Sequence, residues 1–225
     1  MLWDMDGTIV DTEPYWIRAE TALVESFGGR WSSAEAEALV GQALTHSASI
    51  LQTAGVTLSV REIIDRLTGE VINQVRQEVP WRPGARELLQ ELRDEQIPCA
   101  LVTMSESPLA REVVAALPAG TFQHLVTGEM VAKGKPHPEA YEHAVALLAR
   151  TMPGLDKSRI VAIEDSLPGV TAAMAAGVVT LGVPHFLPIP AHPQRTDWPT
   201  LANRSVQDLS GLLTGAGRTE QAQLQ

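Results

Sequence analysis

The sequence predicts an α/β protein in which a doubly wound, mostly parallel, Rossmann-like sheet carries an inserted all-helical cap. Short apolar runs that end in polar residues alternate with helical patterns from about residue 80 onward, which is typical of parallel sheets covered by helices. Residues 14–79 instead show four helical patterns and no strand pattern. We therefore divide the chain into a core of residues 1–13 and 80–213, a cap of residues 14–79 and a flexible tail of residues 214–225.

The first three residues form a short strand pattern that leads into two carboxylates, Asp4 and Asp6, and then into Gly7. Residues i and i+2 of a strand share a face and Asp-Gly marks a turn, so both carboxylates are expected to face one cleft. Such a pair can divide its work, because one ionised carboxylate can attack an electrophile while a second of raised pKa transfers a proton. The pattern also occurs in surface turns and calcium loops, but the twelfth position of a calcium loop requires glutamate and is Tyr15 here.

The predicted cap holds four helices. The first begins at Pro14 and stops at Gly28, and the third covers about residues 45–54. The second and fourth open with capping boxes, in which a serine is followed three residues later by glutamate, and they end at Gly41 and before Pro80; the pairs are Ser32 with Glu35 and Ser59 with Glu62. Two short connections, residues 11–14 and 79–83, join cap and core, so we expect the cap to move, admitting substrate and then excluding water.

The core pattern resumes after Gly84 with a helix, a buried strand at residues 98–102, a helix from Pro108 and a short strand at residues 124–126. A helix beyond Pro138, a strand at residues 160–163, a helix at residues 168–176 and a last strand at residues 178–182 complete the alternation. Prolines then recur between residues 184 and 199, which predicts an irregular segment to which we assign no chemistry.

Polar residues stand where the predicted strands end. Asp4 follows the first strand, Thr103 the second, and Glu164 with Asp165 a later one, while Lys135 lies in a loop before a helix. Because the carboxyl ends of parallel strands lie at one edge of a sheet, we expect these residues to form one site. The oxygens of Asp4, Asp165 and, in one arrangement, Glu164 are hard ligands that suit Mg²⁺, without which these acids would repel one another.

The same edge can hold an anionic substrate group. Lys135 can neutralise a phosphoryl group and keep Asp4 ionised, while Thr103 and the backbone N–H groups of Met5 and Met104 can donate to phosphoryl oxygens. Two simpler interpretations stay open, namely that Thr103 only caps a helix and that Lys133 is the functional lysine. We favour Lys135 because the following proline and helix start fix its approach.

The chain resembles members of the haloacid dehalogenase superfamily, in the branch of helical-cap phosphatases and β-phosphoglucomutases. Four motifs carry the resemblance in the family's order, namely Asp4-Met5-Asp6-Gly7-Thr8, Thr103, Lys135 within Gly-Lys-Pro, and Glu164-Asp165. The resemblance implies that Asp4 is a nucleophile that forms an aspartyl-phosphate and that Asp6 is a general acid and then a base. It also implies Mg²⁺ held by Asp4, the main-chain carbonyl of Asp6 and Asp165, with Glu164 as a ligand or as its support.

These features predict a Mg²⁺-dependent phosphatase that hydrolyses a small phosphorylated metabolite, such as a sugar phosphate. The acid two residues after Asp4 argues for phosphoryl transfer over dehalogenation. A phosphomutase of the β-phosphoglucomutase type is the nearest alternative, and a non-catalytic metal-binding regulatory module is an alternative of another class. Anchors that such mutases use fall at Trp16, Leu44 and Glu106, which argues for hydrolysis, although a gap in the cap could bring His46 to an anchor position.

The cap offers further candidate substrate contacts, although aromatic residues of a cap helix also pack against neighbouring helices. These candidates are Glu13, Tyr15, Trp16 and Leu44.

The composition limits which binding partners and which cellular compartment we expect for this protein. Asp and Glu number 27 against 17 Lys and Arg, giving a net charge of −10 without a basic run, so we expect no nucleic-acid partner. No apolar stretch approaches the roughly 18 residues of a membrane span, and the single cysteine, Cys99, cannot form an internal disulfide. We therefore expect a cytoplasmic monomer that binds a small substrate.

The first strand pattern is short for a central strand, which suggests a native start upstream of Met1.

Overall fold

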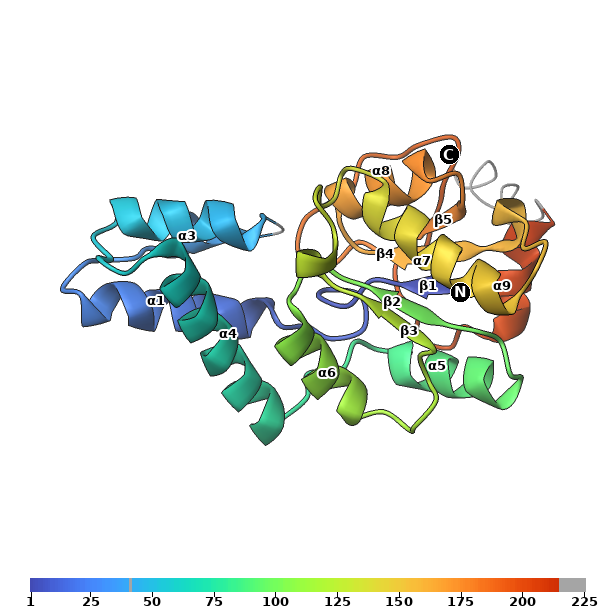
Figure 1. The fold of residues 1–225 in the computed structure, drawn as a ribbon, viewed down its shortest axis with the longest axis horizontal. Helices are drawn as coiled ribbons and strands as arrows, with labels where there is room; N and C mark the ends of the chain where they lie inside the picture. The colour runs from blue at the N-terminus through green and yellow to red at the C-terminus, as the bar shows by residue number, and fades with distance from the viewer. Residues whose placement is uncertain (41, 215–225) are drawn as a thin grey trace.

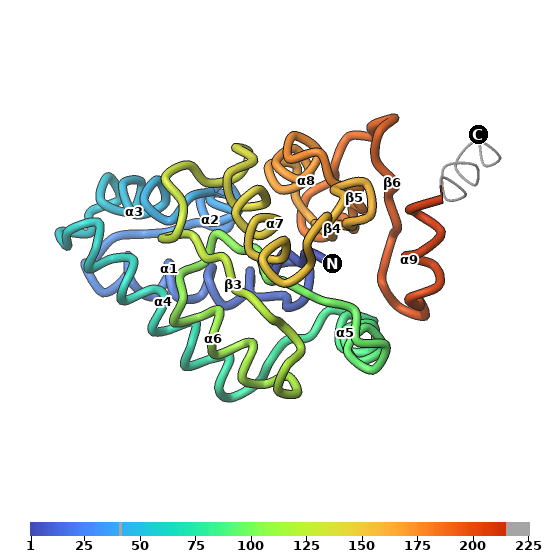
Figure 2. The backbone as a smooth tube through the Cα atoms, turned by 45° about the vertical axis from the view of Figure 1, so that its right-hand side comes forward, coloured from blue at the N-terminus to red at the C-terminus, as the bar shows by residue number. Residues whose placement is uncertain are grey.

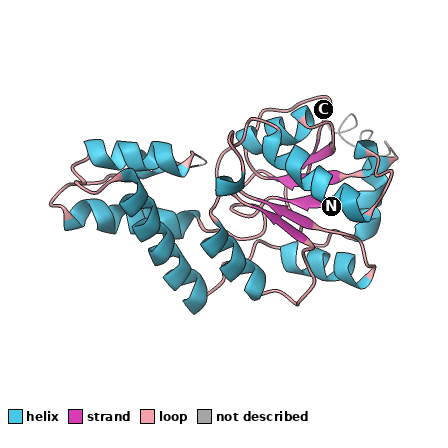
Figure 3. Cartoon of the chain, in the orientation of Figure 1, coloured by secondary structure: helices cyan, strands magenta, loops and turns pink. Residues whose placement is uncertain are grey.

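The structure is a computed structural model that describes residues 1–40 and 42–214. Its described part contains one six-stranded parallel sheet with the strand order β3-β2-β1-β4-β5-β6 (Figures 1 and 3). The strands are β1 (Leu2–Trp3), β2 (Ala100–Val102), β3 (His124–Val126), β4 (Val161–Glu164), β5 (Val179–Gly182) and β6 (Thr196–Asp197). The doubly wound parallel fold predicted from the sequence is confirmed.

Helices connect the strands and cover the sheet. They are α1 (Glu13–Ser26), α2 (Ser33–Glu37), α3 (Leu44–Thr53), α4 (Val60–Gln77), α5 (Ala85–Asp94), α6 (Ser107–Ala115), α7 (Glu139–Thr151), α8 (Leu167–Ala175) and α9 (Val206–Leu213), with short 3₁₀ helices η1 (Gly128–Met130) and η2 (Lys157–Arg159). Alternate strand residues enter different layers: Leu2 and Ala162 pack in the cluster that includes α7 and α8, whereas Trp3 and Ile163 pack with α5, α6 and α9. Figure 2 shows these layers from a second direction.

Helices α1 to α4 form a separate group beside the sheet, on the left in Figure 1. Both predicted capping boxes are present, with Ser32 opening α2 and Ser59 opening α4. The second helix is shorter than the sequence pattern predicts, since it ends at Glu37, and its predicted end at Gly41 lies outside the described residues. Helix α4 packs against both α1 and α3 within the group and against α6 of the sheet layers.

The two connections to this helical group lie side by side. The Asp11 N–H donates to the Pro80 carbonyl at 2.7 Å, and the Arg82 N–H donates to the Ile9 carbonyl at 2.8 Å. Backbone hydrogen bonds therefore tie the two connections to one another between the helical group and the sheet.

The C-terminal region contains regular elements that the sequence pattern did not predict. After the proline-containing stretch, β6 pairs with β5 and α9 packs against α5 and β4. The Arg195 side chain, only 1% exposed, donates to the Asp197 carboxylate at 2.6 and 3.0 Å and to the Pro190 carbonyl at 2.7 Å. A buried arginine that bonds to a neighbouring carboxylate and to a main-chain carbonyl thus stabilises the segment at the sheet edge. Within residues 1–40 and 42–214, no helix combines the length and apolarity needed to cross a bilayer.

Candidate active site

Three carboxylates meet where β1 and β4 end. Asp4 follows β1, Glu164 ends β4 and Asp165 comes next, and one oxygen of each lies within 4.8 Å of the others. The two strands are neighbours in the sheet, and the Asp4 N–H continues their pairing by donating to the Ile163 carbonyl at 3.1 Å. The expected convergence of strand ends therefore brings these acids together, as the sequence motifs suggested.

Asp4 is held by a hydroxyl on one oxygen and an ammonium on the other. Thr8 donates to Oδ2 at 2.9 Å, and the Lys135 Nζ lies 2.6 Å from Oδ1. The carboxylate is 9% exposed, so both contacts act in a partly water-excluded place. Both contacts fix the direction in which its oxygens point.

Lys135 is the lysine that reaches the site, whereas Lys133 is exposed. Its Nζ also lies 2.6 Å from Glu164 Oε1 and donates to the Val102 carbonyl at 2.8 Å. Burial alone would lower the pKa of the Lys135 ammonium, but Asp4 and Glu164 outweigh burial and raise that pKa above its ordinary value. The side chain is therefore a permanent positive charge in the site.

Glu164 is fully buried and lies behind Lys135. Its Oε1 contacts Lys135 and accepts a hydrogen bond from the Tyr141 hydroxyl. A Cβ at Gly169 would come within 1.7 Å of Oε2, so only glycine fits at that point of α8. Burial, and then the charge of Asp4, raise the pKa of Glu164, and Lys135 partly opposes that rise. The Glu164 carboxylate therefore holds the Lys135 ammonium in place.

Asp165 faces the turn that carries the first motif. Gly7 has a φ of +82°, and a Cβ there would lie 2.0 Å from Asp165 Oδ2. Burial, followed by the charges of Asp4 and Glu164, raises the pKa of Asp165 well above its ordinary value. Such repulsion among hard oxygen donors is what a divalent cation relieves, so the chemistry of this donor set fits Mg²⁺.

Asp6 stands beside this cluster and accepts three hydroxyl hydrogen bonds. Thr12 donates to Oδ1 at 2.5 Å, while Ser105 donates to Oδ2 at 2.7 Å and Thr103 donates to it at 3.2 Å. Burial raises the pKa of Asp6, and the charge of Asp4 adds to the rise, whereas the hydroxyl donors lower it. The sequence analysis gave no role to Thr8, Thr12, Ser105 or Tyr141. Thr8 is the last residue of the first motif, Thr12 follows four residues later and Ser105 lies two residues after Thr103, so a hydroxyl within or close to a motif is the signal that could have pointed to these three.

Of the four cap residues proposed as substrate contacts, one carries a charge near the carboxylate cluster and three pack within the helical group. Glu13 is half-buried at the start of α1, and burial, followed by the charges of Asp6, Glu20 and Asp11, raises its pKa to about 8. Trp16 is buried in the hydrophobic cluster, Leu44 packs against that cluster, and Tyr15 donates its hydroxyl to the Glu78 carbonyl at 2.9 Å. Among these four, Glu13 is the side chain whose charge interacts with the carboxylates of Asp6 and Asp165.

A second buried acid, Glu20, lies within the helical group. It is 6% exposed, and burial raises its pKa from 4.5 to about 7, while the nearby Trp31 side chain partly opposes that rise. A raised pKa in the folded state means that the folded chain binds the proton more tightly than the unfolded chain. The stability that this proton contributes is therefore complete below about pH 4.5 and is lost as the pH rises through about 7.

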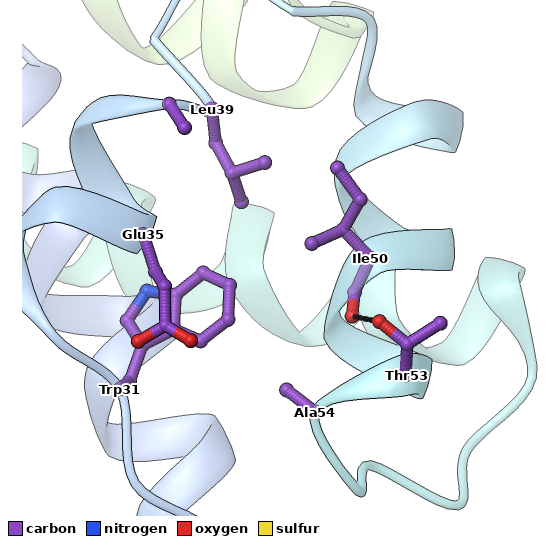
Figure 4. Close-up of a pocket in the computed structure, with 7 residues that line it drawn as sticks. Trp31, Glu35, Leu39, Ile50, Thr53 and Ala54 are labelled. Carbon is purple, nitrogen blue, oxygen red and sulfur yellow. Dashed lines mark hydrogen bonds between the residues drawn. The ribbon is translucent and has the colours of Figure 1, made fainter.

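An open pocket of about 230 Å³ lies between α2 and α3 (Figure 4). None of the residues that line it belongs to the carboxylate cluster. Trp31, Glu35, Leu39 and Ile50 are among its lining residues. Its polar side chains that carry oxygen are already bonded, since Glu35 accepts from Ser32 and the Thr53 hydroxyl donates to the Ile50 carbonyl at 2.7 Å. The buried Nε1 of Trp31 has no hydrogen-bond partner among the described residues. We therefore assign the chemistry to the strand ends and not to this pocket.

The chain thus combines a parallel sheet of this strand order, three acids at the ends of two central strands and a group of helices inserted after β1. The family model of haloacid dehalogenase-like hydrolases matches residues 1–183, and the chain belongs to this family. The resemblance seen in the four motifs is thereby confirmed.

Two related proteins indicate which kind of hydrolase this chain resembles. The chain is 29% identical to the phosphorylated carbohydrates phosphatase of Thermotoga maritima over 193 residues, which is 83% of this chain and 86% of the relative. It is 33% identical to hexitol phosphatase A of Escherichia coli over 186 residues, or 81% of each protein. These relatives confirm the predicted enzyme class, a hydrolase of the phosphatase kind.

The fold also matches that of a solved structure. CbbY from Rhodobacter sphaeroides, crystallised in complex with phosphate, superposes with a TM-score of 0.81 at 24% identity, over 93% of this chain and 97% of that chain. At this identity the match concerns the fold alone.

Proposed function

We propose that the chain is a Mg²⁺-dependent phosphatase that hydrolyses a small phosphorylated metabolite, such as a sugar phosphate, through an aspartyl-phosphate on Asp4. The observation that carries this proposal is the Asp4 carboxylate, paired with Lys135 at 2.6 Å, within 4.8 Å of two further acids and two residues from the hydroxyl-bonded Asp6. Asp4 is thus oriented to act as a nucleophile, and Asp6, whose pKa is raised, can transfer protons.

In the first step an Asp4 oxygen attacks phosphorus while the bond between phosphorus and the leaving oxygen breaks. Lys135 and Thr8 orient Asp4 through the contacts described above, so the attack starts from a fixed geometry. Asp6 gives its proton to the departing oxygen, which leaves as an alcohol. The products are the aspartyl-phosphate on Asp4 and the dephosphorylated metabolite.

In the second step the ionised Asp6 accepts a proton from a water molecule, whose oxygen attacks phosphorus. The bond between phosphorus and Asp4 breaks, which releases inorganic phosphate and regenerates the Asp4 carboxylate. The same side chain therefore serves as acid and then as base, and the proton balance closes over one turnover.

Several groups would receive the phosphoryl oxygens. Lys135 supplies a fixed positive charge, and Thr103 and the Met104 N–H stand on the adjacent loop. Asp4, Asp165 and the main-chain carbonyl of Asp6 would hold Mg²⁺. When bound, this ion withdraws charge from the phosphoryl oxygens. Because the Glu164 oxygen Oε1 is already engaged by Lys135 and Tyr141, we assign Glu164 to supporting the site in place of direct ligation.

Charge around the cleft favours a monophosphate over a second, distal phosphate. Glu106, which stands where related mutases carry a lysine, forms a two-bond ion pair with Arg61 of α4 at 2.7 and 2.8 Å. Glu13, from α1, adds another carboxyl near the catalytic acids. Trp16 and Leu44 lie in or against the hydrophobic cluster, and any substrate contact from them stays a prediction. Hydrolysis therefore suits these surroundings better than a mutase reaction with a bisphosphate.

We also propose that the cap rotates about the paired connections between residues 9–11 and 80–82 to admit substrate and exclude water. Comparing the cap orientation by small-angle scattering with and without the phosphate mimic orthovanadate tests this motion. An unchanged scattering profile at saturation would contradict it. The monomeric state and the cytoplasmic location stay predictions.

The function is tested by phosphate release from p-nitrophenyl phosphate and from a panel of phosphorylated metabolites, with Mg²⁺ and with EDTA. We expect turnover that requires the metal and disappears in Asp4→Asn. A protein that binds metal but shows no turnover with any of these substrates would favour the non-catalytic module. Incubation with β-glucose 1-phosphate and a trace of glucose 1,6-bisphosphate separates the mutase, which would form glucose 6-phosphate faster than free phosphate.

A further inference from the structure

The Asp6 carboxylate is oriented by hydroxyls from two parts of the chain. Thr12 belongs to the first cap connection, whereas Thr103 and Ser105 belong to the loop after β2. Of the two loop donors, Ser105 is the closer, at 2.7 Å against 3.2 Å for Thr103. Ser105 is 7% exposed, so little water competes for its hydrogen bond.

Two of these donors, Thr103 and Thr12, would each lose the hydrogen bond to Asp6 at some stage of the proposed reaction. The Thr103 hydroxyl has one proton and already accepts from the Ser105 N–H at 3.0 Å, so donation to a phosphoryl oxygen would withdraw its proton from Asp6. Thr12 lies on the segment that must change conformation if the cap rotates. Among the described residues that bond to the Asp6 side chain, this leaves Ser105 as the donor whose bond survives both substrate binding and cap movement.

The backbone around Ser105 is held firmly. Its carbonyl accepts from the Gly128 N–H at 3.0 Å, and a Cβ at Gly128 would lie 2.2 Å from the Met104 carbonyl oxygen, so the two loops are in direct contact. On the other side of Ser105, the Ser107 N–H donates to the Glu129 carboxylate at 2.9 Å, so the loop is held there by residues outside the cap. A side chain fixed at both ends of its loop can position a neighbour more accurately than one on a free loop.

We propose that Ser105 is a positioning residue that keeps the Asp6 carboxyl aimed at the leaving oxygen while Thr103 serves the phosphoryl group and the cap moves. This inference rests on the proposed function, because it assumes that Asp6 transfers protons. Its consequence is a dependence on leaving group. Loss of Ser105 should matter most when the departing oxygen needs a proton, and least when the leaving group departs readily without one.

The test compares single-turnover phosphoenzyme formation from p-nitrophenyl phosphate, a good leaving group, and from butyl phosphate, a poor one. For Ser105→Ala we expect the rate with butyl phosphate to fall about 10- to 100-fold, a part of what general acid catalysis contributes, and the rate with p-nitrophenyl phosphate to change less than about threefold. Ser105→Thr, which keeps a hydroxyl, should recover most of the butyl phosphate rate, whereas Ser105→Val, of similar shape, should not.

Ser107→Ala is the matched control, because the Ser107 hydroxyl contacts Thr127 and Glu129 instead of Asp6. Equal losses on both substrates, or rates like those of the unaltered protein, would overturn the positioning role. If Ser105→Ala fails to fold, the Thr and Val pair decides the question with the same readout. A wild-type protein without metal-dependent turnover on either substrate would instead refute the proposed function, so the two failures are distinguishable.

Discussion

Replacing Lys135 by methionine tests the electrostatic centre of the site. The lysine side chain is 5% exposed and pairs at 2.6 Å with two carboxylates that are 9% and 0% exposed, those of Asp4 and Glu164. Its removal leaves both acids without their counter-charge and the Val102 carbonyl without its donor. Loss of one partner from a buried pair costs about 3–5 kcal/mol, and we expect the free energy of unfolding to fall by about that amount near pH 8 in EDTA.

The cost should depend on pH with a definite sign. Burial and Asp4 already raise the pKa of Glu164 in the folded chain, and without Lys135 that pKa rises further. A raised folded-state pKa gives stability that is present at low pH and is lost as the pH rises through it. Near pH 5.5 the destabilisation by Lys135→Met should therefore be smaller, by about 1 kcal/mol or more, since one pKa unit corresponds to about 1.4 kcal/mol.

Urea unfolding at both pH values measures these quantities, with Glu164→Gln added to Lys135→Met as the matched double variant. Because the second change removes one of the stranded charges, the double variant should be more stable near pH 8 than Lys135→Met alone. A loss below about 1 kcal/mol near pH 8, or strictly additive losses in the double variant, would refute the reasoning.

Three further predictions follow from single contacts. Gly7→Ala forces a Cβ to within 2.0 Å of Asp165 Oδ2, so we expect phosphatase activity to fall about 100-fold or more and metal affinity to fall with it, as isothermal titration would show. Glu20→Gln should stabilise the fold by at most about 3 kcal/mol near pH 8.5 and by little near pH 5, measured by urea unfolding. Arg61→Gln should cost less than about 1 kcal/mol at low salt and still less at high salt, because Arg61 is 54% exposed in its pair with Glu106.

Each of these three substitutions has a matched control substitution elsewhere in the chain. Gly28→Ala, with no atom within 4 Å of the added Cβ, separates backbone strain from the clash at Asp165. Glu25→Gln changes the same charge on an exposed position of α1 and should show no such pH dependence. Arg76→Gln breaks the other pair between α4 and α6, with Glu112. A normal activity in Gly7→Ala, a pH-independent effect of Glu20→Gln, or a salt-independent loss in Arg61→Gln would contradict the respective argument.

The elements that the sequence predicted are those with strong local signals. Buried strands such as β2 and β4 are short apolar runs, and the capping boxes at Ser32 and Ser59 use residues only three positions apart. Strand ends converge because the sheet is parallel, so the position of Asp4 beside Asp165 followed from the motif spacing and the fold class. Local pattern and general topology were sufficient for these features.

The features that escaped prediction depend on side chains that meet across long sequence separations. Ser105 and Asp6 are 99 residues apart, and only the folded loop shows which hydroxyl reaches the carboxylate. Strand β6 has two residues and follows prolines, so it carries no period-two pattern. Arg195 is a charge that composition places at the surface, yet Asp197 and a carbonyl satisfy it in the interior.

The most direct test of the central claim is to quench the enzyme with acid during the first turnover and map the phosphorylated peptide. We predict a hydroxylamine-sensitive phosphoryl group on Asp4 that requires Mg²⁺, accumulates in Asp6→Asn when a good leaving group supplies it, and is absent in Asp4→Asn. Phosphate release without any phosphorylated peptide, or a phosphoryl group on a residue other than Asp4, would contradict the account.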